Sequence, residues 1–123
     1  MMFHYEKLDH VQLAAPRGEE EKARTFYQEV LGFDEVEKPV SLQKNGGVWF
    51  QAGAVQLHIG VDEPFTPAKK AHPAIQVKNI EKMKRHLDEL EINYQVDSKL
   101  PGANRFYIHD PFGNRLEFLE WIQ

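Results

Sequence analysis

The sequence predicts an α+β domain in which two βαβββ modules form one curved, cup-like mixed sheet of eight strands, with the helices on its outer face. In the first half of the chain, apolar and polar residues alternate as in β-strands on both sides of one amphipathic helix. The second half repeats that order. Equivalent positions keep a near-constant spacing: 62 residues separate His10 from His72, and 61 separate Gln56 from Glu117. An internal duplication leaves such a spacing.

The length of 123 residues fits one domain, which we assign to residues 1–123. Two prolines and the absence of any periodicity mark residues 62–70 as a linker. The linker divides the domain into module one, residues 5–61, and module two, residues 71–123.

Module one is predicted to begin with an alternating strand from Leu8 to Ala14, which Pro16 and Gly18 end. A helix follows, because Ala23, Phe26, Tyr27, Val30 and Leu31 form an apolar stripe and Gly32 suits its end. Three further strands are expected at Phe33–Glu37, Val48–Gln51 and Ala54–Val61.

Module two repeats this order. A strand is expected from His72 to Val77, followed by a helix with Asn79 as its N-cap and Ile80, Met83, Leu87 and Leu90 on one face. The remaining predicted strands are Tyr94–Val96, Arg105–His109 and Asn114–Trp121, with a turn at residues 110–114 before the last.

Composition removes several functional classes. The chain has no cysteine, so any metal ligands must be His, Asp, Glu or Gln side chains. A net charge of −4 without clustered Lys and Arg argues against a nucleic-acid partner. No apolar stretch approaches membrane-spanning length, and no signal peptide is recognisable, so we expect a cytoplasmic protein without a membrane partner.

The alternation of the first and fourth strands of each module places polar residues opposite the apolar residues that pack under the helices. By this parity His10, Gln56, His72 and Glu117 project from the same, open face of the sheet. A sheet covered by helices on one side only must leave that face wet, pair it with another sheet or curve it around a ligand.

Three segments resemble the vicinal-oxygen-chelate superfamily of glyoxalases, bleomycin-resistance proteins, fosfomycin thiol transferases and extradiol dioxygenases. They are residues 8–13, residues 72–77 and especially residues 110–118, Asp-Pro-Phe-Gly-Asn-Arg-Leu-Glu-Phe. The resemblance implies that His10, His72 and Glu117 bind one divalent metal, with Zn, Ni, Fe(II) and Mn as candidates. Gln56 stands where bacterial glyoxalases have a glutamate, so a pair of carboxylates at the metal is missing.

Such a site leaves open coordination positions for water or for a substrate with two adjacent oxygens. Glu117, His58 and Tyr107 are the candidate catalytic residues, and Trp49, Gln56, Arg105 and Tyr107 are the candidate substrate-binding residues. Each also has an ordinary explanation. His10 and His72 could be hydrogen-bonded strand histidines, Glu117 could pair with an arginine such as Arg115, and the other side chains could line a wall or fill the core.

We therefore expect a small metal-dependent, glyoxalase-like enzyme, a lyase or a related dioxygenase, acting on a small molecule. The alternatives are an extradiol dioxygenase and a metal-free binding protein of the bleomycin-resistance type. We also expect a homodimer, because open strand edges attract partners. The sequence does not decide whether one chain or two supply the site.

Overall fold

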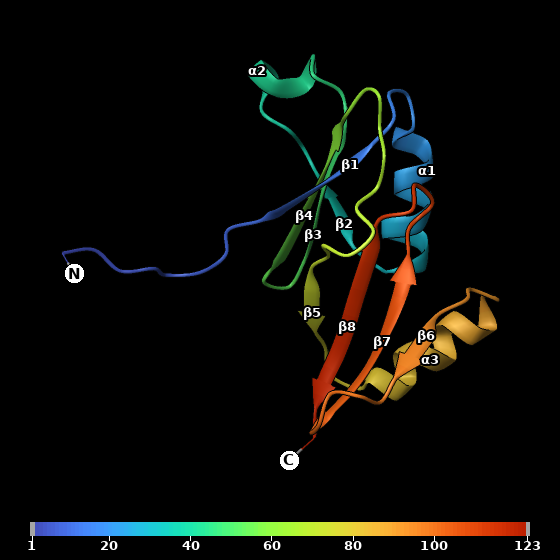
Figure 1. Cartoon of the computed structure of the whole chain (residues 1–123). Helices are drawn as coiled ribbons and strands as arrows, with labels where there is room; N and C mark the ends of the chain where they lie inside the picture. Colours follow the sequence, from blue (N-terminus) through green and yellow to red (C-terminus); the bar gives the residue numbers. More distant parts are fainter. Residues whose placement is uncertain (1, 123) are drawn as a thin grey trace.

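The computed structural model describes residues 2–122, and the two βαβββ modules are confirmed. Figure 1 shows module one above module two, with both main helices on one side of the strands. The eight strands are divided between two four-stranded mixed sheets, one in each module.

In module one the sheet order is β1-β4-β3-β2, so β1 is an outermost strand. β1 runs parallel to β4, whereas β3 runs antiparallel to both β4 and β2. The bounds are Val11–Ala15 for β1, Asp34–Val36 for β2, Val48–Ala52 for β3 and Val55–Val61 for β4.

Module two repeats this pairing in the order β5-β8-β7-β6, with β5 outermost and parallel to β8. β7 runs antiparallel to both of its neighbours. The bounds are Ala74–Gln76 for β5, Gln95–Asp97 for β6, Ala103–His109 for β7 and Arg115–Trp121 for β8.

The predicted helices form and pack as the apolar stripes require. α1 (Glu20–Arg24) continues into a π-helical turn, η1 (Thr25–Val30), whose wider turn still buries Phe26 and Tyr27. α3 (Ile80–Glu89) buries Ile80 and Leu87. These side chains pack against the buried residues of the two sheets, among them Leu57, Ile59, Phe106, Leu116 and Phe118.

Several local predictions differ from the structure: the fifth strand begins at Ala74 rather than His72, and Asn79 makes no side-chain cap for α3. The first strand begins at Val11 rather than Leu8, because Val11 is the first residue that pairs with β4. A short helix that the sequence did not suggest, α2 (Val40–Gln43), lies between β2 and β3.

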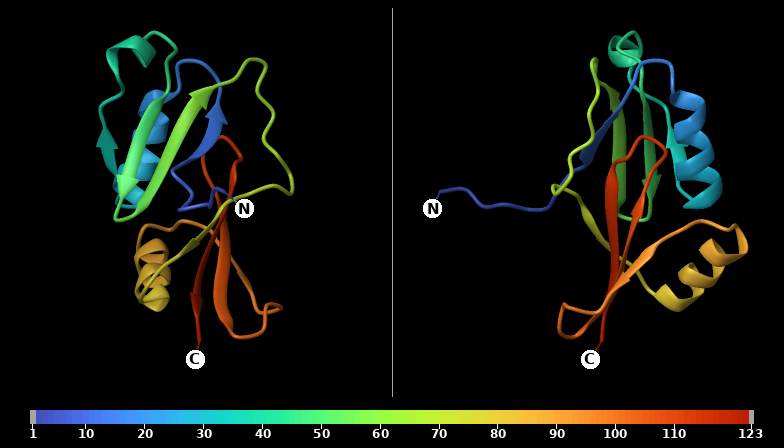
Figure 2. Two further views of the ribbon diagram at one scale, coloured as in Figure 1. Left: turned by 90° about the vertical axis from the view of Figure 1, so that its left-hand side faces the viewer. Right: turned by 45° about the vertical axis from the view of Figure 1, so that its right-hand side comes forward.

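Residues 2–10 form an arm that carries His10 at its base. All nine residues are exposed, including Tyr5 and Leu8 at 89% and 77%. In Figures 1 and 2 the arm leaves the molecule on the side opposite the helices.

The turn before β8 ties the two modules together. Tyr27 donates a hydrogen bond of 2.7 Å from its hydroxyl to Asp110, and Asp110 accepts bonds from the main chain of Phe112 and Asn114. Asn114 donates to the carbonyl of Ala14 in β1, at 2.7 Å. The turn that precedes Arg115 and Glu117 is therefore anchored to module one.

Candidate functional site

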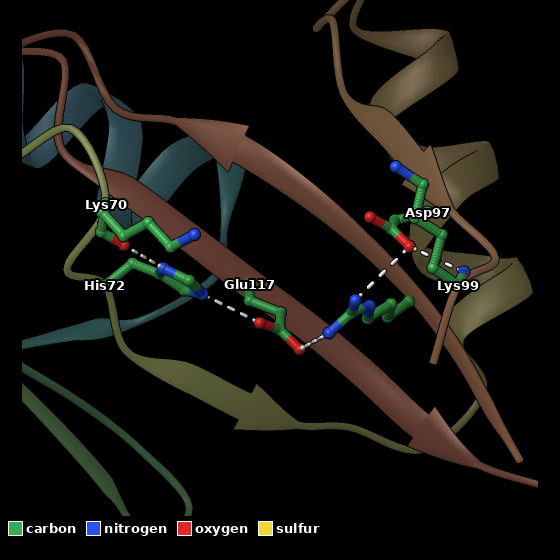
Figure 3. A network of polar contacts seen from close by, with 6 residues as sticks. Lys70, His72, Asp97, Lys99 and Glu117 are labelled. Carbon is green, nitrogen blue, oxygen red and sulfur yellow. Dashed lines mark hydrogen bonds and ion pairs between the residues drawn. The ribbon is translucent and has the colours of Figure 1, made fainter. Parts of the chain in front are cut away.

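In module two, a chain of polar contacts joins the segment before β5 to β8, β7 and β6 (Figure 3). His72, two residues before β5, has Nε2 at 2.9 Å from Glu117 Oε1. The other oxygen of Glu117 accepts a bond of 3.3 Å from Arg105, which also contacts Asp97 at 3.4 Å. A main-chain hydrogen bond from Lys99, helped by Arg105, lowers the pKa of Asp97. Glu117 itself is only 6% exposed.

The two ring nitrogens of His72 both face acceptor oxygens. Nδ1 lies 2.7 Å from the carbonyl oxygen of Lys70, which can only accept, so Nδ1 must carry a proton. In the neutral ring, Nε2 then has no proton, and its lone pair points at the carboxylate of Glu117. A proton on Nε2 satisfies both Nε2 and Oε1, and the same two atoms would serve as ligands if a metal cation were bound. Metal-binding histidines use this arrangement, in which the other ring nitrogen donates to a carbonyl.

Tyr107 lies beside this chain of contacts. Its ring meets the ring of His72 edge to face, at 5.4 Å between centroids. The guanidinium carbons of Arg105 and Arg115 lie over Tyr107 at 5.4 and 4.0 Å from its centroid. Tyr107 is 9% exposed, so it acts as a buried wall against which His72 and Arg115 pack.

In module one, three rings stack on the open side of the sheet. His58 lies between Trp49, at 3.9 Å and nearly parallel, and His10, at 4.1 Å. The cross-strand register of Trp49 and His58 brings the first two together. His10 is more exposed, and its Nδ1 lies 2.9 Å from the carboxylate of Asp9. The hydrogen bond with His10 lowers the pKa of Asp9.

The surroundings of His58 favour its neutral form. Its exposed fraction is 5%, and its Nε2 has no hydrogen-bond partner among residues 2–122. Burial, followed by the charge on His10 when that ring is protonated, lowers the pKa of His58. A neutral imidazole with a buried, unpartnered nitrogen can exchange one proton with a polar group that reaches it.

The candidate residues thus form two half-sites. Half-site two is His72, Glu117, Arg105 and Tyr107, and half-site one is His10, His58 and Trp49. Within residues 2–122, no three His, Asp or Glu side chains of one chain are placed to hold a metal ion, so His10 is not brought to His72 and Glu117. Gln56 is partly buried opposite Gln51 in the β3–β4 ladder.

The ordinary explanation of these residues is also partly met. His10 and His72 are both hydrogen-bonded, and Glu117 does pair with an arginine. That arginine is Arg105, however, and Arg115 instead lies over Tyr107.

Three contributors were missed by the sequence analysis. The Lys70 carbonyl is a main-chain group, so residue type gives no sign of it. Asp97 pairs with Arg105 across two strands, and the register that joins them is set by the fold. Asp9 could have been found, because an acid next to a candidate ligand histidine can orient its ring.

A cavity of about 600 Å³ lies between the modules, beside half-site two. His72, Arg115 and Asn114 form part of its wall, and β1, the end of β4 and the segment between β4 and β5 form the rest. This volume lies in the range typical of small-molecule sites. No helix among residues 2–122 is long and apolar enough to cross a membrane.

Comparisons with known proteins agree on one family. The sequence profile of the Glyoxalase/Bleomycin resistance protein/Dioxygenase superfamily matches residues 7–118. The chain is 27% identical to Glyoxylase I 4 of Arabidopsis thaliana over 93% of this chain and 70% of that protein.

Solved structures match over nearly the whole chain. A glyoxalase family protein from Bacillus anthracis is 48% identical, with a TM-score of 0.95 and coverage of 98% and 99% of the two chains. A fosfomycin resistance protein, FosX, from Listeria monocytogenes, solved with Mn(II), is 16% identical, with a TM-score of 0.75 and coverage of 96% and 94%, and shows the fold alone. The chain belongs to the Glyoxalase/Bleomycin resistance protein/Dioxygenase superfamily.

Proposed function

We propose that the protein is a metal-dependent, glyoxalase-like enzyme in which His72 and Glu117 hold one divalent cation. The observation that carries this proposal is the pairing of His72 Nε2 with Glu117 Oε1 while Nδ1 donates to the Lys70 carbonyl. The imidazole and the carboxylate form a donor pair that suits Zn, Ni, Fe(II) or Mn. FosX, which shares the fold, is described in complex with Mn(II).

His10 is the proposed third ligand, supplied by a second copy of the chain. Two observations support this arrangement. Within residues 2–122 of one chain, no third His, Asp or Glu completes the pair. His10 is also at the base of an arm directed away from the molecule, next to β1, an outermost strand. A twofold dimer that sets module one of each copy against module two of the other would form two equal sites.

The bound metal would act as a Lewis acid that holds two adjacent substrate oxygens and stabilises negative charge on them. The protein side chains then orient the substrate and move its proton. Gln56 cannot serve as a base, because an amide does not take up a proton near neutral pH. His58, neutral and with a free Nε2, is the proposed proton carrier. Tyr107 and Arg105 position Glu117 and the substrate.

Titration calorimetry with Mn²⁺ and Zn²⁺ on chelator-treated protein tests the metal site. We expect the parent to bind one ion per chain. Loss of a group that only orients a ligand costs roughly 10–100-fold in affinity, so His72→Ala and Glu117→Gln should each lose more than about 100-fold. His86→Ala is the matched control, because His86 lies on α3 and bonds the Val30 carbonyl, and should bind as the parent does. A parent without stoichiometric binding, or variants that bind equally well, would contradict the proposal.

Activity assays on the metal-loaded protein then separate the reactions found in this superfamily. Isomerisation of the methylglyoxal–glutathione adduct would identify a lyase. Ring opening of a catechol by the Fe(II)-loaded protein would identify a dioxygenase. A metal-free binding protein would instead keep its ligand after chelation. That alternative has less support, because the Trp49 ring packs against His58. The homodimer and the cytoplasmic location are part of this proposal.

A further inference from the structure

Arg115 is a charged side chain of module two that lies next to half-site two without bonding to its carboxylate. It is the first residue of β8, partly buried, and its guanidinium lies 4.0 Å from the centre of the Tyr107 ring. Among residues 2–122 it makes no ion pair, whereas Arg105 contacts both Glu117 and Asp97. An arginine with five donor N–H groups and no carboxylate is prepared to bind an anion.

The position of Arg115 connects it to the proposed metal ligand. Tyr107 contacts both Arg115 and His72, so one buried ring sets the spacing between these two side chains. Both Arg115 and His72 also line the cavity of about 600 Å³. A small molecule in this cavity can therefore reach both side chains.

Among the residues that line the cavity, Arg115 is the one Arg or Lys side chain. Asp97 and Glu117 both pair with Arg105, and neither carboxylate contacts Arg115. Asp62 is the acidic residue of the cavity wall and lies just beyond β4, on the module-one side.

We propose that Arg115 is the subsite for an oxyanion, a carboxylate or a phosphate, carried by the substrate next to its two adjacent oxygens. Guanidinium binds either group through two parallel hydrogen bonds. The oxyanion subsite specifies the substrate class of the proposed enzyme as a small acid rather than a neutral diol or ketone. The link to two adjacent oxygens rests on the proposed function, whereas the binding of the oxyanion does not.

The test compares three probes that share a glycerol skeleton: glycerate, glycerol 3-phosphate and glycerol. Binding is followed by NMR chemical shifts on chelator-treated protein. We expect at least one anion to bind roughly tenfold more tightly than glycerol, because a hydrogen bond to a charged group contributes about that much affinity. The anion that binds identifies the oxyanion as carboxylate or phosphate.

Arg115→Met keeps an apolar chain over Tyr107 and removes the charge, so it should lose this preference while binding Mn²⁺ as the parent does. Arg115→Lys should retain part of it, because it keeps the charge without the planar fork. Arg85→Met, on the exposed face of α3, is the control and should behave as the parent. Equal binding of all three probes by the parent, or an unchanged preference in Arg115→Met, would overturn the proposal.

Failure of this proposal and failure of the proposed function are distinguishable. A parent that binds Mn²⁺ but does not prefer an anion keeps the metal site and loses the oxyanion subsite. A parent that prefers an anion through Arg115 but binds no metal keeps the subsite and loses the metal-dependent function.

Discussion

At the scale of single residues, Tyr27 links the module-one core to the turn that positions Glu117. Its hydroxyl is buried and donates to Asp110 at 2.7 Å. Burial, with the negative charge of Asp110, raises the pKa of Tyr27 well above its ordinary value. The folded state therefore holds the Tyr27 proton more tightly than the unfolded state does.

Tyr27→Phe should lower the free energy of unfolding by about 1.5–3 kcal/mol, the contribution of a hydrogen bond to a charged group. Because the folded-state pKa is raised, the stabilisation is complete below the pKa of the unfolded chain. It is lost as the pH rises above about 10. Urea unfolding at several pH values measures both effects. Tyr5→Phe, at an exposed tyrosine, is the control. A Tyr27→Phe protein with the stability and alkaline loss of the parent would contradict this role.

Residue type was sufficient to select His72, Glu117, Arg105 and Tyr107 as candidates, and the structure brings these four together. It was not sufficient to select their contacts. The Lys70 carbonyl that orients His72 belongs to the main chain, and Arg115, which the ordinary explanation offered as one possible partner of Glu117, lies over Tyr107. Both depend on strand register and side-chain direction, which pattern does not specify.

At the scale of elements, α3 begins at the predicted residue but is capped differently. Asn79 has φ of 60° and makes no side-chain cap. The carboxylate of Glu120 in β8 instead accepts hydrogen bonds of 3.1 Å from the main chain of Asn79 and Ile80. A negative charge at a helix N-terminus also interacts favourably with the helix dipole. The cap therefore joins the helix to the strand that carries Glu117.

Glu120→Ala should lower the free energy of unfolding by about 0.5–2 kcal/mol, the range for a lost N-cap. Glu120→Gln, which keeps one acceptor oxygen and removes the charge, should lose less. Chemical denaturation followed by circular dichroism gives both values. Glu89→Ala, at the other end of α3, is the control. Equal stability of Glu120→Ala and the parent would show that the carboxylate does not act as the cap.

Periodicity predicted the order of the strands and both main helices, because buried faces impose periods of two and 3.6 residues. It failed where pairing partners decide the outcome. Leu8–His10 alternate with their neighbours like a strand, yet they extend past the end of the β1–β4 ladder. α2 is four residues long, too short to show an amphipathic period.

At the scale of the whole molecule, the two modules are joined at one end by the bonds of Tyr27, Asp110 and Asn114. Each sheet keeps its first strand, β1 or β5, at its edge. The sequence predicted one eight-stranded sheet from equivalent positions in the two modules. Equivalence along the chain does not specify which strands pair, so the division into two four-stranded sheets and the separation of the two half-sites could not be predicted.

The central claim is that His10 of one copy completes the His72–Glu117 pair of another. A heterodimer of the His10→Ala and His72→Ala chains, co-expressed with different tags and purified through both, tests it directly. Exchange between copies leaves one intact site, so the heterodimer should bind Mn²⁺ with parental affinity at about half the parental stoichiometry. Each variant alone should bind no ion tightly. If each site took all its ligands from one chain, every chain of this heterodimer would lack one ligand and no ion would bind tightly. That result would contradict the shared site.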